Sequence, residues 1–401
     1  MRFPTTVALL FLLFSSISTQ AQYKRKTALD ARIKEISKNN PLPTFIVGGV
    51  NKDGIFYQYA SGSKIWGKSE PINIHHIFRI ASMTKAITSV AAMQLVEQGK
   101  LTLDEPLDKL MPEMASIPIL DKEGNVVKAS GSITLRHLLT HTAGFGYTFL
   151  HDRLDKFSKN KPSNYTLPNL PRVFESGSSW QYGTNTDWVG RIVEKVSGMN
   201  LENYVQTYIS KPLGMRRNFF SVPDSLVSEI TSFGQLVDGK FVADSLGIYK
   251  DIKTTKYNGG GGLFSTFYDY AQFIRCILND GTLNKHQILK KSTLDLMFEN
   301  HIGELLTVIK EPSSAYPFLV SDTFTFVSPG KFGLGWAIDH QGRAHIREPG
   351  TVYWGGIQNT YFSIDRKKGQ AVMFFSNNYP FGNPFVEDIY YKAEGAIYQV
   401  K

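Results

Sequence analysis

The sequence predicts an α+β fold, with an antiparallel sheet flanked by helices and a mainly helical second lobe. Strand-like alternation occurs at 44–60 and returns from 233 onward, toward the two ends of the chain. Helical patterns dominate the stretch between them, and a last helical pattern at 385–400 follows the final strand. Strands, a helical insertion, more strands and a terminal helix are the order expected when one sheet packs against helices.

The first residues have the pattern of a secretory signal peptide. Arg2 precedes an apolar stretch at 7–14, and small and polar residues then lead to Ala21. We expect residues 1–21 to be removed and the protein to be exported to the periplasm or the extracellular space. No stable membrane anchor is expected, because the apolar stretch is too short and no cysteine follows it closely.

The remaining length is enough for about two or three structural units. We assign residues 22–105 and 233–401 to a sheet domain and residues 106–232 to a mainly helical domain.

The chain has a net charge of +9, and its dense basic clusters, 24–26 and 366–368, are not interleaved with aromatic residues. They are therefore predicted to be solvated surface and not a nucleic-acid site. Cys276 is the sole cysteine, which excludes an intramolecular disulfide.

The first half of the chain is expected to begin with a hairpin and continue with helices. Its elements, in order, are strands at 44–50 and 55–60, a strand at 72–80, helices at 82–99 and 133–141, an exposed loop at 151–171, and helices at 184–196 and 201–209. Thr134 is placed to cap the second helix, and Gly198 to end the third. The second half is expected to contain strands at 235–242, 335–339, 344–347, 360–364 and 371–376, with helices at 268–278, 292–300 and 385–400.

The helix at 82–99 is apolar on nearly every side, so it should be buried. Ser82 is expected at its N-cap or in its first turn, and Gly99 just past its end. Lys85 is its only cation and lies one turn after Ser82 on the same face. Because burial disfavours a charged lysine, Lys85 can serve as a general base beside a nucleophilic serine. The alternative is a purely structural role, with a capping serine and a lysine that extends its amine to solvent.

Two other motifs indicate different classes of protein. Residues 62–69 match the phosphate-binding pattern G-x-x-x-x-G-K-[ST] of nucleotide hydrolases, but Pro71 and a strand-like segment follow where a helix would be needed. A plain connection between strands is the better interpretation. His137 and His141 are one turn apart and could hold a metal, but no third ligand has suitable spacing, so packing or capping roles are favoured. A glycine-rich turn is expected at 259–262.

Tyr182 lies in a turn before a predicted helix, where its phenol is available to a site. Taken alone it is a structural tyrosine. Together with Ser82 and Lys85 it can supply the proton shuttle that such a pair needs.

At this point the chain resembles the serine β-lactamase-like family, and it is most similar to the family VIII carboxylesterases, which are related to class C β-lactamases and D-Ala-D-Ala peptidases. The segment at 78–85, Phe-Arg-Ile-Ala-Ser-Met-Thr-Lys, is similar to the nucleophile segment of the family. Further segments that look like family landmarks are 101–106, 133–144, 213–215, 259–265, 281–283 and 332–336.

The resemblance implies that Ser82 is the nucleophile, Lys85 its base and Tyr182 the second acid/base. Trp354-Gly355-Gly356 stands where β-lactamases usually have K-T-G, and Thr184 stands where they usually have the asparagine of Y-x-N. Both departures favour the esterase branch over a lactamase.

We therefore expect a secreted serine hydrolase that cleaves carboxylic esters through an acyl-enzyme. The backbone N–H groups of Ser82 and Ile357 would form the oxyanion hole, and Trp354, Gly355, Gly356 and Thr184 would contact the substrate. Trp354 and the aromatic segment 318–326 are candidates for an apolar acyl pocket. The alternatives are a β-lactamase or D-amino-acid peptidase, and a penicillin-binding-like protein that acylates and stalls. The expected partner is a small-molecule ester or lactam, and no cofactor or metal is implied.

Overall fold

A computed structural model describes residues 24–161, 165, 169–244, 252–321 and 330–399. The expected signal peptide at 1–21 lies outside the described residues. No helix in the described ranges is long and apolar enough to cross a membrane.

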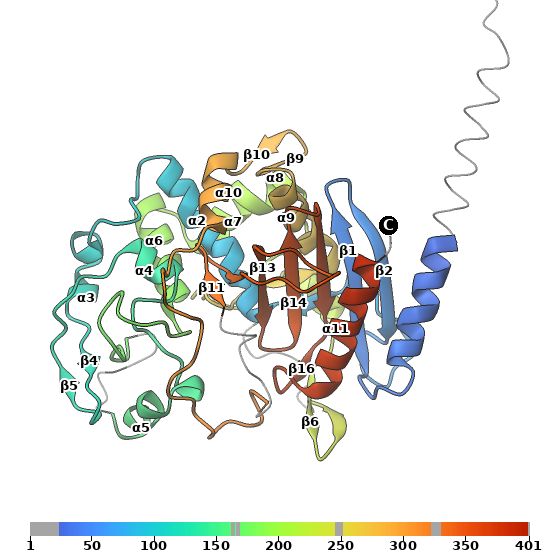
Figure 1. Cartoon of the computed structure of the whole chain (residues 1–401), viewed down its shortest axis with the longest axis horizontal. Helices are drawn as coiled ribbons and strands as arrows, with labels where there is room; N and C mark the ends of the chain where they lie inside the picture. The colour runs from blue at the N-terminus through green and yellow to red at the C-terminus, as the bar shows by residue number, and fades with distance from the viewer. Residues whose placement is uncertain (1–23, 162–164, 166–168, 245–251, 322–329, 400–401) are drawn as a thin grey trace, which may run out of the picture.

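A seven-stranded antiparallel sheet joins the two ends of the chain (Figure 1). Its order is β11-β12-β13-β14-β15-β1-β2. The strands are β1 (Thr44–Asn51), β2 (Ile55–Gly62), β11 (Lys331–Phe332), β12 (Ala337–Asp339), β13 (Thr351–Gly356), β14 (Thr360–Asp365) and β15 (Gln370–Phe375). Because β1 pairs with β15, strands about 320 residues apart lie side by side, which confirms the predicted antiparallel sheet.

Helices cover both faces of this sheet. Side chains alternate along a strand, so Phe45 and Val47 of β1 pack toward one face while Ile46 packs toward the other. The first face is covered by α11 (Pro384–Tyr398) and by a helix at 24–37 that the sequence analysis did not predict (Figure 1). The second face is covered by α2 (Thr84–Glu97) and α9 (Phe267–Leu278).

The helical lobe lies beside the sheet, on the left of Figure 1. It contains α3 (Pro112–Ala115), α4 (Leu135–Leu139), α5 (Asp152–Asn160), α6 (Asn185–Ser197), α7 (Leu201–Val205) and α8 (Lys211–Leu213). Thr134 caps α4 as predicted, because its side chain accepts a hydrogen bond from the backbone N–H of His137. Gly198 ends α6 in the left-handed conformation. These elements lie inside the range assigned to the helical domain, whose boundaries stay a prediction.

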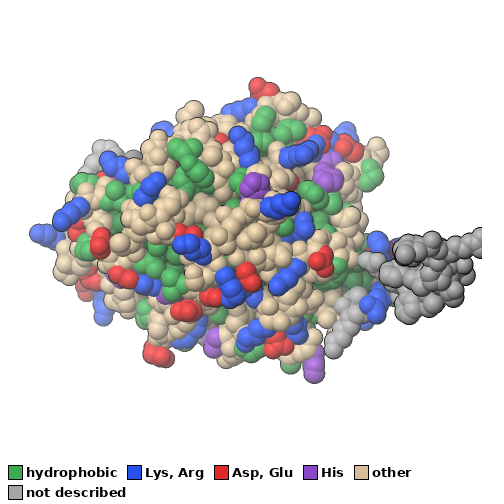
Figure 2. Space-filling view, turned by 90° about the horizontal axis from the view of Figure 1, so that it is seen from above, with side chains coloured by type: hydrophobic (Ala, Val, Ile, Leu, Met, Phe, Trp, Pro, Cys, Tyr) green, Lys and Arg blue, Asp and Glu red, His purple; other side chains and the backbone are tan. Residues whose placement is uncertain are grey.

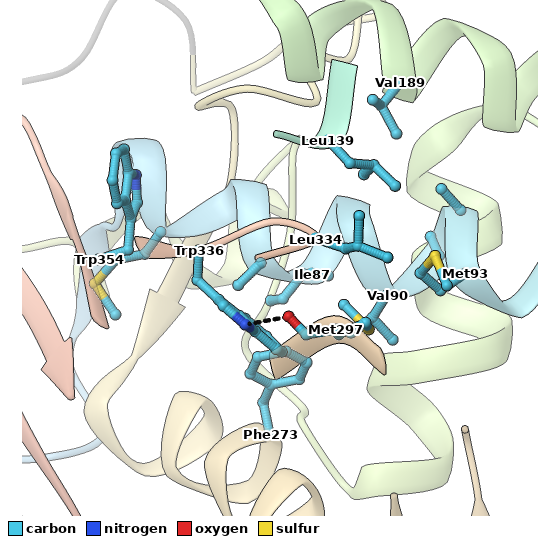
Figure 3. Close-up of a cluster of buried hydrophobic side chains, with 14 of the residues drawn as sticks. Ile87, Val90, Met93, Leu139, Val189, Phe273, Met297, Leu334, Trp336 and Trp354 are labelled. Atoms are coloured by element: carbon cyan, nitrogen blue, oxygen red, sulfur yellow. Dashed lines mark hydrogen bonds between the residues drawn. The ribbon is translucent and has the colours of Figure 1, made fainter. Parts of the chain in front are cut away.

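The helix α2 runs through the interior, between the sheet and the helical lobe. Its residues from Thr84 to Leu95 are all buried, as its apolar sequence predicts. Figure 3 shows side chains of α2 packed among residues from the helical lobe and from the C-terminal half of the chain. There the indole of Trp336 donates a hydrogen bond of 3.0 Å to the carbonyl of Met297 in α10 (Lys291–Phe298).

Of the two positions predicted for Ser82, the N-cap is wrong, and the first helical turn is present as a 3₁₀ turn that leads directly into α2. The α-helix begins at Thr84, and Ser82 lies in a preceding 3₁₀ turn, Ala81–Met83, so Ser82 is not an N-cap. Gly99 follows the helix with φ +68°, as predicted for the residue just past its end.

Four other predicted elements are wrong in part or in full. In 72–80 only β3 (Ile77–Arg79) is a strand, so His75 and His76 lie in a turn. The predicted loop at 151–171 contains α5, because Leu154 is buried with Leu120, Leu170 and Val173 and His151 caps the helix. The predicted strand at 235–242 is a hairpin, β6 (Gly234–Val237) and β7 (Lys240–Ala243), since Asp238 and Gly239 between them have positive φ. Residues 344–347 form a turn.

The surface carries charges of both signs. Figure 2 shows basic and acidic side chains interspersed over the face seen from above.

Cys276 is buried in α9, where burial raises the pKa of its thiol to about 12. A thiol in that state is protonated and unreactive.

Candidate active site

The structure brings the side chains of Ser82, Lys85 and Tyr182 within hydrogen-bonding distance of one another. The phenol of Tyr182 donates to Ser82 Oγ over 2.6 Å, and Lys85 Nζ donates to the same oxygen over 3.2 Å. Lys85 Nζ also lies 4.7 Å from the centre of the Tyr182 ring. A hydroxyl that contacts an amine and a phenol is the arrangement expected for a serine nucleophile beside two groups that can move its proton.

The turn that carries Ser82 is held in an uncommon backbone conformation. Ala81 has φ +43°, in the left-handed region that residues with a side chain rarely adopt. The hydroxyl of Thr84 donates to the Ala81 carbonyl over 2.6 Å and accepts from the Leu263 N–H at 3.1 Å. The Ile80 carbonyl accepts from the Thr360 hydroxyl at 3.2 Å. These contacts anchor the turn to the sheet and to the segment before β8 (Phe264–Thr266), so Ser82 is fixed relative to both.

Lys85 is buried and has two further partners. Its amine donates to the carbonyl oxygen of Gly260 over 2.6 Å and to the phenol oxygen of Tyr147 over 3.1 Å. Its side chain is nearly inaccessible, with the residue 1% exposed. The predicted turn at 259–262 is present, but none of its glycines has a positive φ, so its contribution is the carbonyl group and not a left-handed bend.

A buried carboxylate lies behind this turn. Asp187 of α6 accepts a hydrogen bond of 3.3 Å from the N–H of Gly260, the residue whose carbonyl meets Lys85. Burial raises the pKa of Asp187, and the charge of Lys85 opposes this rise. An added Cβ at Gly260 would lie 2.7 Å from the Asp187 carboxylate, so this approach requires glycine.

Sequence reasoning missed Tyr147, Gly260 and Asp187 as parts of the site. Burial, and next the neighbouring Tyr182 phenol, raise the pKa of Tyr147 well above its usual value, so its phenol is neutral. Tyr147 follows the landmark segment 133–144 by three residues, and no motif marks it. The four consecutive glycines at 259–262 were visible in the sequence, but the pattern does not say which carbonyl turns toward Lys85.

His141 supports the site by packing. Its ring lies 5.0 Å from that of Tyr182 and stacks at 6.3 Å on Trp354, and Asn185 hydrogen-bonds to its Nδ1 at 2.8 Å. Burial, and next the charge of Lys85, hold the pKa of His141 well below its usual value, so the imidazole is neutral. His137 takes part in the cap of α4. Among the described residues no cluster of three or more His, Cys, Asp or Glu is arranged to hold a metal.

The predicted oxyanion and substrate residues are only partly brought together. Ser82, Ile357, Trp354 and Gly355 line a cavity of about 280 Å³ that also holds Tyr182. Gly356 does not line it, and an added Cβ there would lie 2.3 Å from the Ile80 carbonyl, so this glycine permits close packing of β13 on the nucleophile turn.

Thr184 is also buried away from the cavity, at the N-cap position of α6. In the aromatic segment 318–326, Phe318 is 55% exposed and Val320 lines the cavity, while 322–326 lies outside the described residues.

The phosphate-binding alternative does not fit the fold. Gly62 ends β2, and the segment that follows runs through turns and a bridge between Ser63 and Pro71 to β3, with no helix after Ser69. A phosphate loop needs a helix N-terminus at that point. The interpretation of 62–69 as a connection between strands is confirmed.

Comparisons with known proteins show the family of the chain. A sequence model of the family described as Beta-lactamase matches residues 29–397. The monacolin J acid methylbutanoyltransferase of Aspergillus terreus is 32% identical over 349 residues, which cover 82% of this chain and 83% of that protein. The lovastatin esterase of Penicillium rubens is 31% identical over 349 residues, covering 80% and 85% respectively. The solved structure of unliganded simvastatin synthase (LovD) of Aspergillus terreus superposes with a TM-score of 0.80 at 26% identity, covering 93% of this chain and 98% of that one.

Proposed function

Because the chain belongs to the Beta-lactamase family of serine hydrolases and acyltransferases, we propose that it cleaves carboxylic esters through an acyl-enzyme on Ser82. The family membership and the ester-related relatives confirm the resemblance to the esterase branch. The observation that carries the proposal is the convergence of the Tyr182 phenol and the Lys85 amine on one hydroxyl, at 2.6 and 3.2 Å.

The reaction begins with attack of Ser82 Oγ on the ester carbonyl. Lys85 receives the hydroxyl proton, and the Gly260 carbonyl and the Tyr147 phenol hold its amine in place. Tyr182 then donates a proton to the leaving alkoxide. The Tyr182 phenolate next takes a proton from water, which attacks the acyl-enzyme, and protonated Lys85 returns its proton to Ser82 Oγ as the acid leaves. Ser82 and Ile357 line the cavity, and their backbone N–H groups would stabilise the oxyanion, a contribution of about a hundredfold or more per donor.

The test is hydrolysis of short p-nitrophenyl esters by the Ser82→Ala variant. Loss of the nucleophile should abolish hydrolysis. Ser61→Ala should retain it, because Ser61 of β2 also stands three residues before a lysine, Lys64, but does not line the cavity. Circular dichroism checks that both variants fold. Full activity of Ser82→Ala would exclude the proposed nucleophile.

The side chain at 354 favours esters over lactams. Family β-lactamases usually place a lysine here to bind the substrate carboxylate, whereas Trp354 packs 5.0 Å from the Tyr182 ring and offers no cation. Nitrocefin should therefore turn over more slowly than a p-nitrophenyl ester. Nitrocefin or D-Ala-D-Ala peptide turnover above the ester rate would support the lactamase or peptidase alternative, and an acyl adduct that persists for hours would support a protein that stalls.

Acyl transfer to an alcohol is a second candidate, which the similarity to a methylbutanoyltransferase favours. The same acyl-enzyme would react with an alcohol in place of water. Addition of a small alcohol to an ester assay separates the two: a transferase forms the new ester with unchanged release of p-nitrophenol, while a strict hydrolase forms only the acid.

Export is the remaining part of the proposal. It is supported by the pattern of Arg2, the apolar stretch at 7–14 and the small residues that end at Ala21. The N-terminus of the protein recovered from the extracytoplasmic fraction should begin at or near Gln22. Recovery of the full-length chain from the cytoplasm alone would contradict it.

A further inference from the structure

The cavity continues beyond Ser82 toward the face of the sheet that α11 covers. Along β13, Tyr353 and Gly355 alternate with Trp354, so they face α11 while Trp354 faces Tyr182. An added Cβ at Gly355 would lie 2.9 Å from the Tyr361 ring, so glycine leaves open the passage between the two compartments. We call the second compartment the α11 chamber, which is lined by Arg347, Tyr353, Tyr361, Glu387, Tyr390 and Tyr391.

Tyrosine rings form a continuous wall in this chamber. Tyr361 stacks on Tyr390 with centroids 4.9 Å apart, and Tyr390 lies 5.2 Å from Tyr391. Rings of this kind already hold guanidinium groups nearby, since Arg347 lies 5.3 Å from the Tyr353 centroid and Arg343 lies 4.8 Å from that of Tyr391. Such a wall suits alkyl groups that carry a positive charge.

The charges around the chamber leave one carboxylate uncompensated. Arg347 pairs with Asp339 at 2.9 Å and with Glu394 at 3.4 Å, and Glu394 also pairs with Arg343 at 2.9 Å. These two cations and two anions cancel. Glu387 is different, because in the described part of the chain no side chain forms a hydrogen bond or ion pair with its carboxylate.

Burial raises the pKa of Glu387, and no neighbouring cation offsets this rise. An anion that is partly desolvated without a partner is costly, and a bound cation would remove the cost.

We propose that the α11 chamber binds an alkylammonium group of the substrate, with the Glu387 carboxylate as its counter-ion. The inference rests on the proposed function, because a molecule bound in the chamber is a substrate only if Ser82 cleaves esters. The binding of a cation itself does not depend on it. Ser82 and Glu387 both line the cavity, so one substrate could place its carbonyl at Ser82 and its cation at Glu387.

A structural role for Glu387 is the alternative. It lies in the first turn of α11, where a carboxylate stabilises a helix N-terminus. Asp388 is the next residue and offers a matched control, because it is exposed, pairs with Lys392 at 2.6 Å and does not line the cavity. Glu387→Gln and Asp388→Asn each remove one negative charge from the same part of α11, so a helix-terminus effect should appear in both.

The experiment measures binding by titration calorimetry to the Ser82→Ala protein, so no turnover is required. The probes are choline butanoate and its neutral isostere, in which a tert-butyl group replaces trimethylammonium. A second pair carries the same two groups at the end of the acyl chain. In at least one of the two pairs, the cationic probe should bind about tenfold more tightly than its neutral isostere. Adding Glu387→Gln should reduce this ratio nearly to one, and adding Asp388→Asn should leave it unchanged.

Equal binding of the cationic and neutral probes in both pairs would overturn the inference, and so would an equal loss of preference in the two charge variants. If Glu387→Gln does not fold, the comparison within the Ser82→Ala protein still decides. A cation preference in a protein that hydrolyses no ester would support the chamber and contradict the proposed function.

Discussion

At the scale of single residues, Tyr182 is the side chain whose role is most open to test. Its phenol donates to Ser82 Oγ at 2.6 Å, and Lys85 reaches the same oxygen from another side. Two groups on one hydroxyl allow a division of labour, in which the amine takes the proton during attack and the phenol supplies one to the leaving group.

Tyr182→Phe should therefore lower kcat for p-nitrophenyl esters by about 10²–10⁴-fold with little change in KM, because it removes only the hydroxyl. Steady-state kinetics measures both constants. Tyr208→Phe, at a residue that is 44% exposed, should leave both unchanged. A kcat for Tyr182→Phe within a factor of three of wild type would mean that Lys85 works without the phenol.

At the scale of elements, β13 and the nucleophile turn act as one unit. Gly356 lies so close to the Ile80 carbonyl that a Cβ there would come within 2.3 Å of it and within 2.4 Å of the Thr360 hydroxyl. The Thr360 hydroxyl itself donates to that carbonyl. The position of Ser82 relative to Ile357, the two expected oxyanion donors, therefore depends on this contact.

Gly356→Ala should separate β13 from the turn, lower the free energy of unfolding by about 1–3 kcal/mol and reduce kcat. Chemical denaturation and ester kinetics measure the two effects. Gly54→Ala is the matched control, since an added Cβ there meets nothing within 4 Å, and it should change neither quantity by much. Wild-type kcat in Gly356→Ala would show that the contact does not position the donors.

The elements that sequence reasoning predicted well are those with a strong local signal. The period of β1 and β2, the apolar surface of α2 and the cap residues Thr134 and Gly198 all indicated the structure that is present. The segment 151–171 has a weak and misleading local signal. Its polar composition is typical of loops, yet tertiary burial of Leu154 stabilises α5 there.

The same limit applies to the site. Ser82 and Lys85 are one turn apart, so their pairing follows from the period of a helix. Tyr147 contacts Lys85, and Asp187 contacts Gly260, only because the helical lobe folds against α2. No local pattern indicates a contact between residues 62 or more positions apart. The turn before a predicted helix made Tyr182 a candidate proton shuttle, and the family resemblance then implied its role as the second acid/base.

At the scale of the whole molecule, buried histidines connect stability to pH. Burial, and next the charge of Lys85, lower the pKa of His141 in the folded state. The unfolded chain has the ordinary value of about 6.5, so below that pH it binds a proton that the folded protein does not. Above about pH 6.5, His141 does not change the free energy of unfolding. Below that pH, protonation of His141 in the unfolded chain lowers the free energy of unfolding.

The free energy of unfolding should fall by about 1.4 kcal/mol per pH unit for this group below pH 6.5. Urea titrations of wild type and His141→Gln between pH 5 and 7 should show a shallower slope in the variant by about that amount. His286→Gln, on the exposed strand β10 (His286–Gln287), is the control. Identical slopes in wild type and His141→Gln would contradict the neutral, buried imidazole.

The proposed reaction passes through a covalent intermediate at Ser82, between the sheet and the helical lobe. Rapid mixing of the protein with p-nitrophenyl butanoate, acid quenching and peptide mass spectrometry detect it directly. We predict a butanoyl group on the peptide that contains Ser82, and a larger amount of it in Tyr182→Phe if the phenol activates the deacylating water. A butanoyl group on another residue, or hydrolysis with no acylated peptide in either protein, would contradict the account.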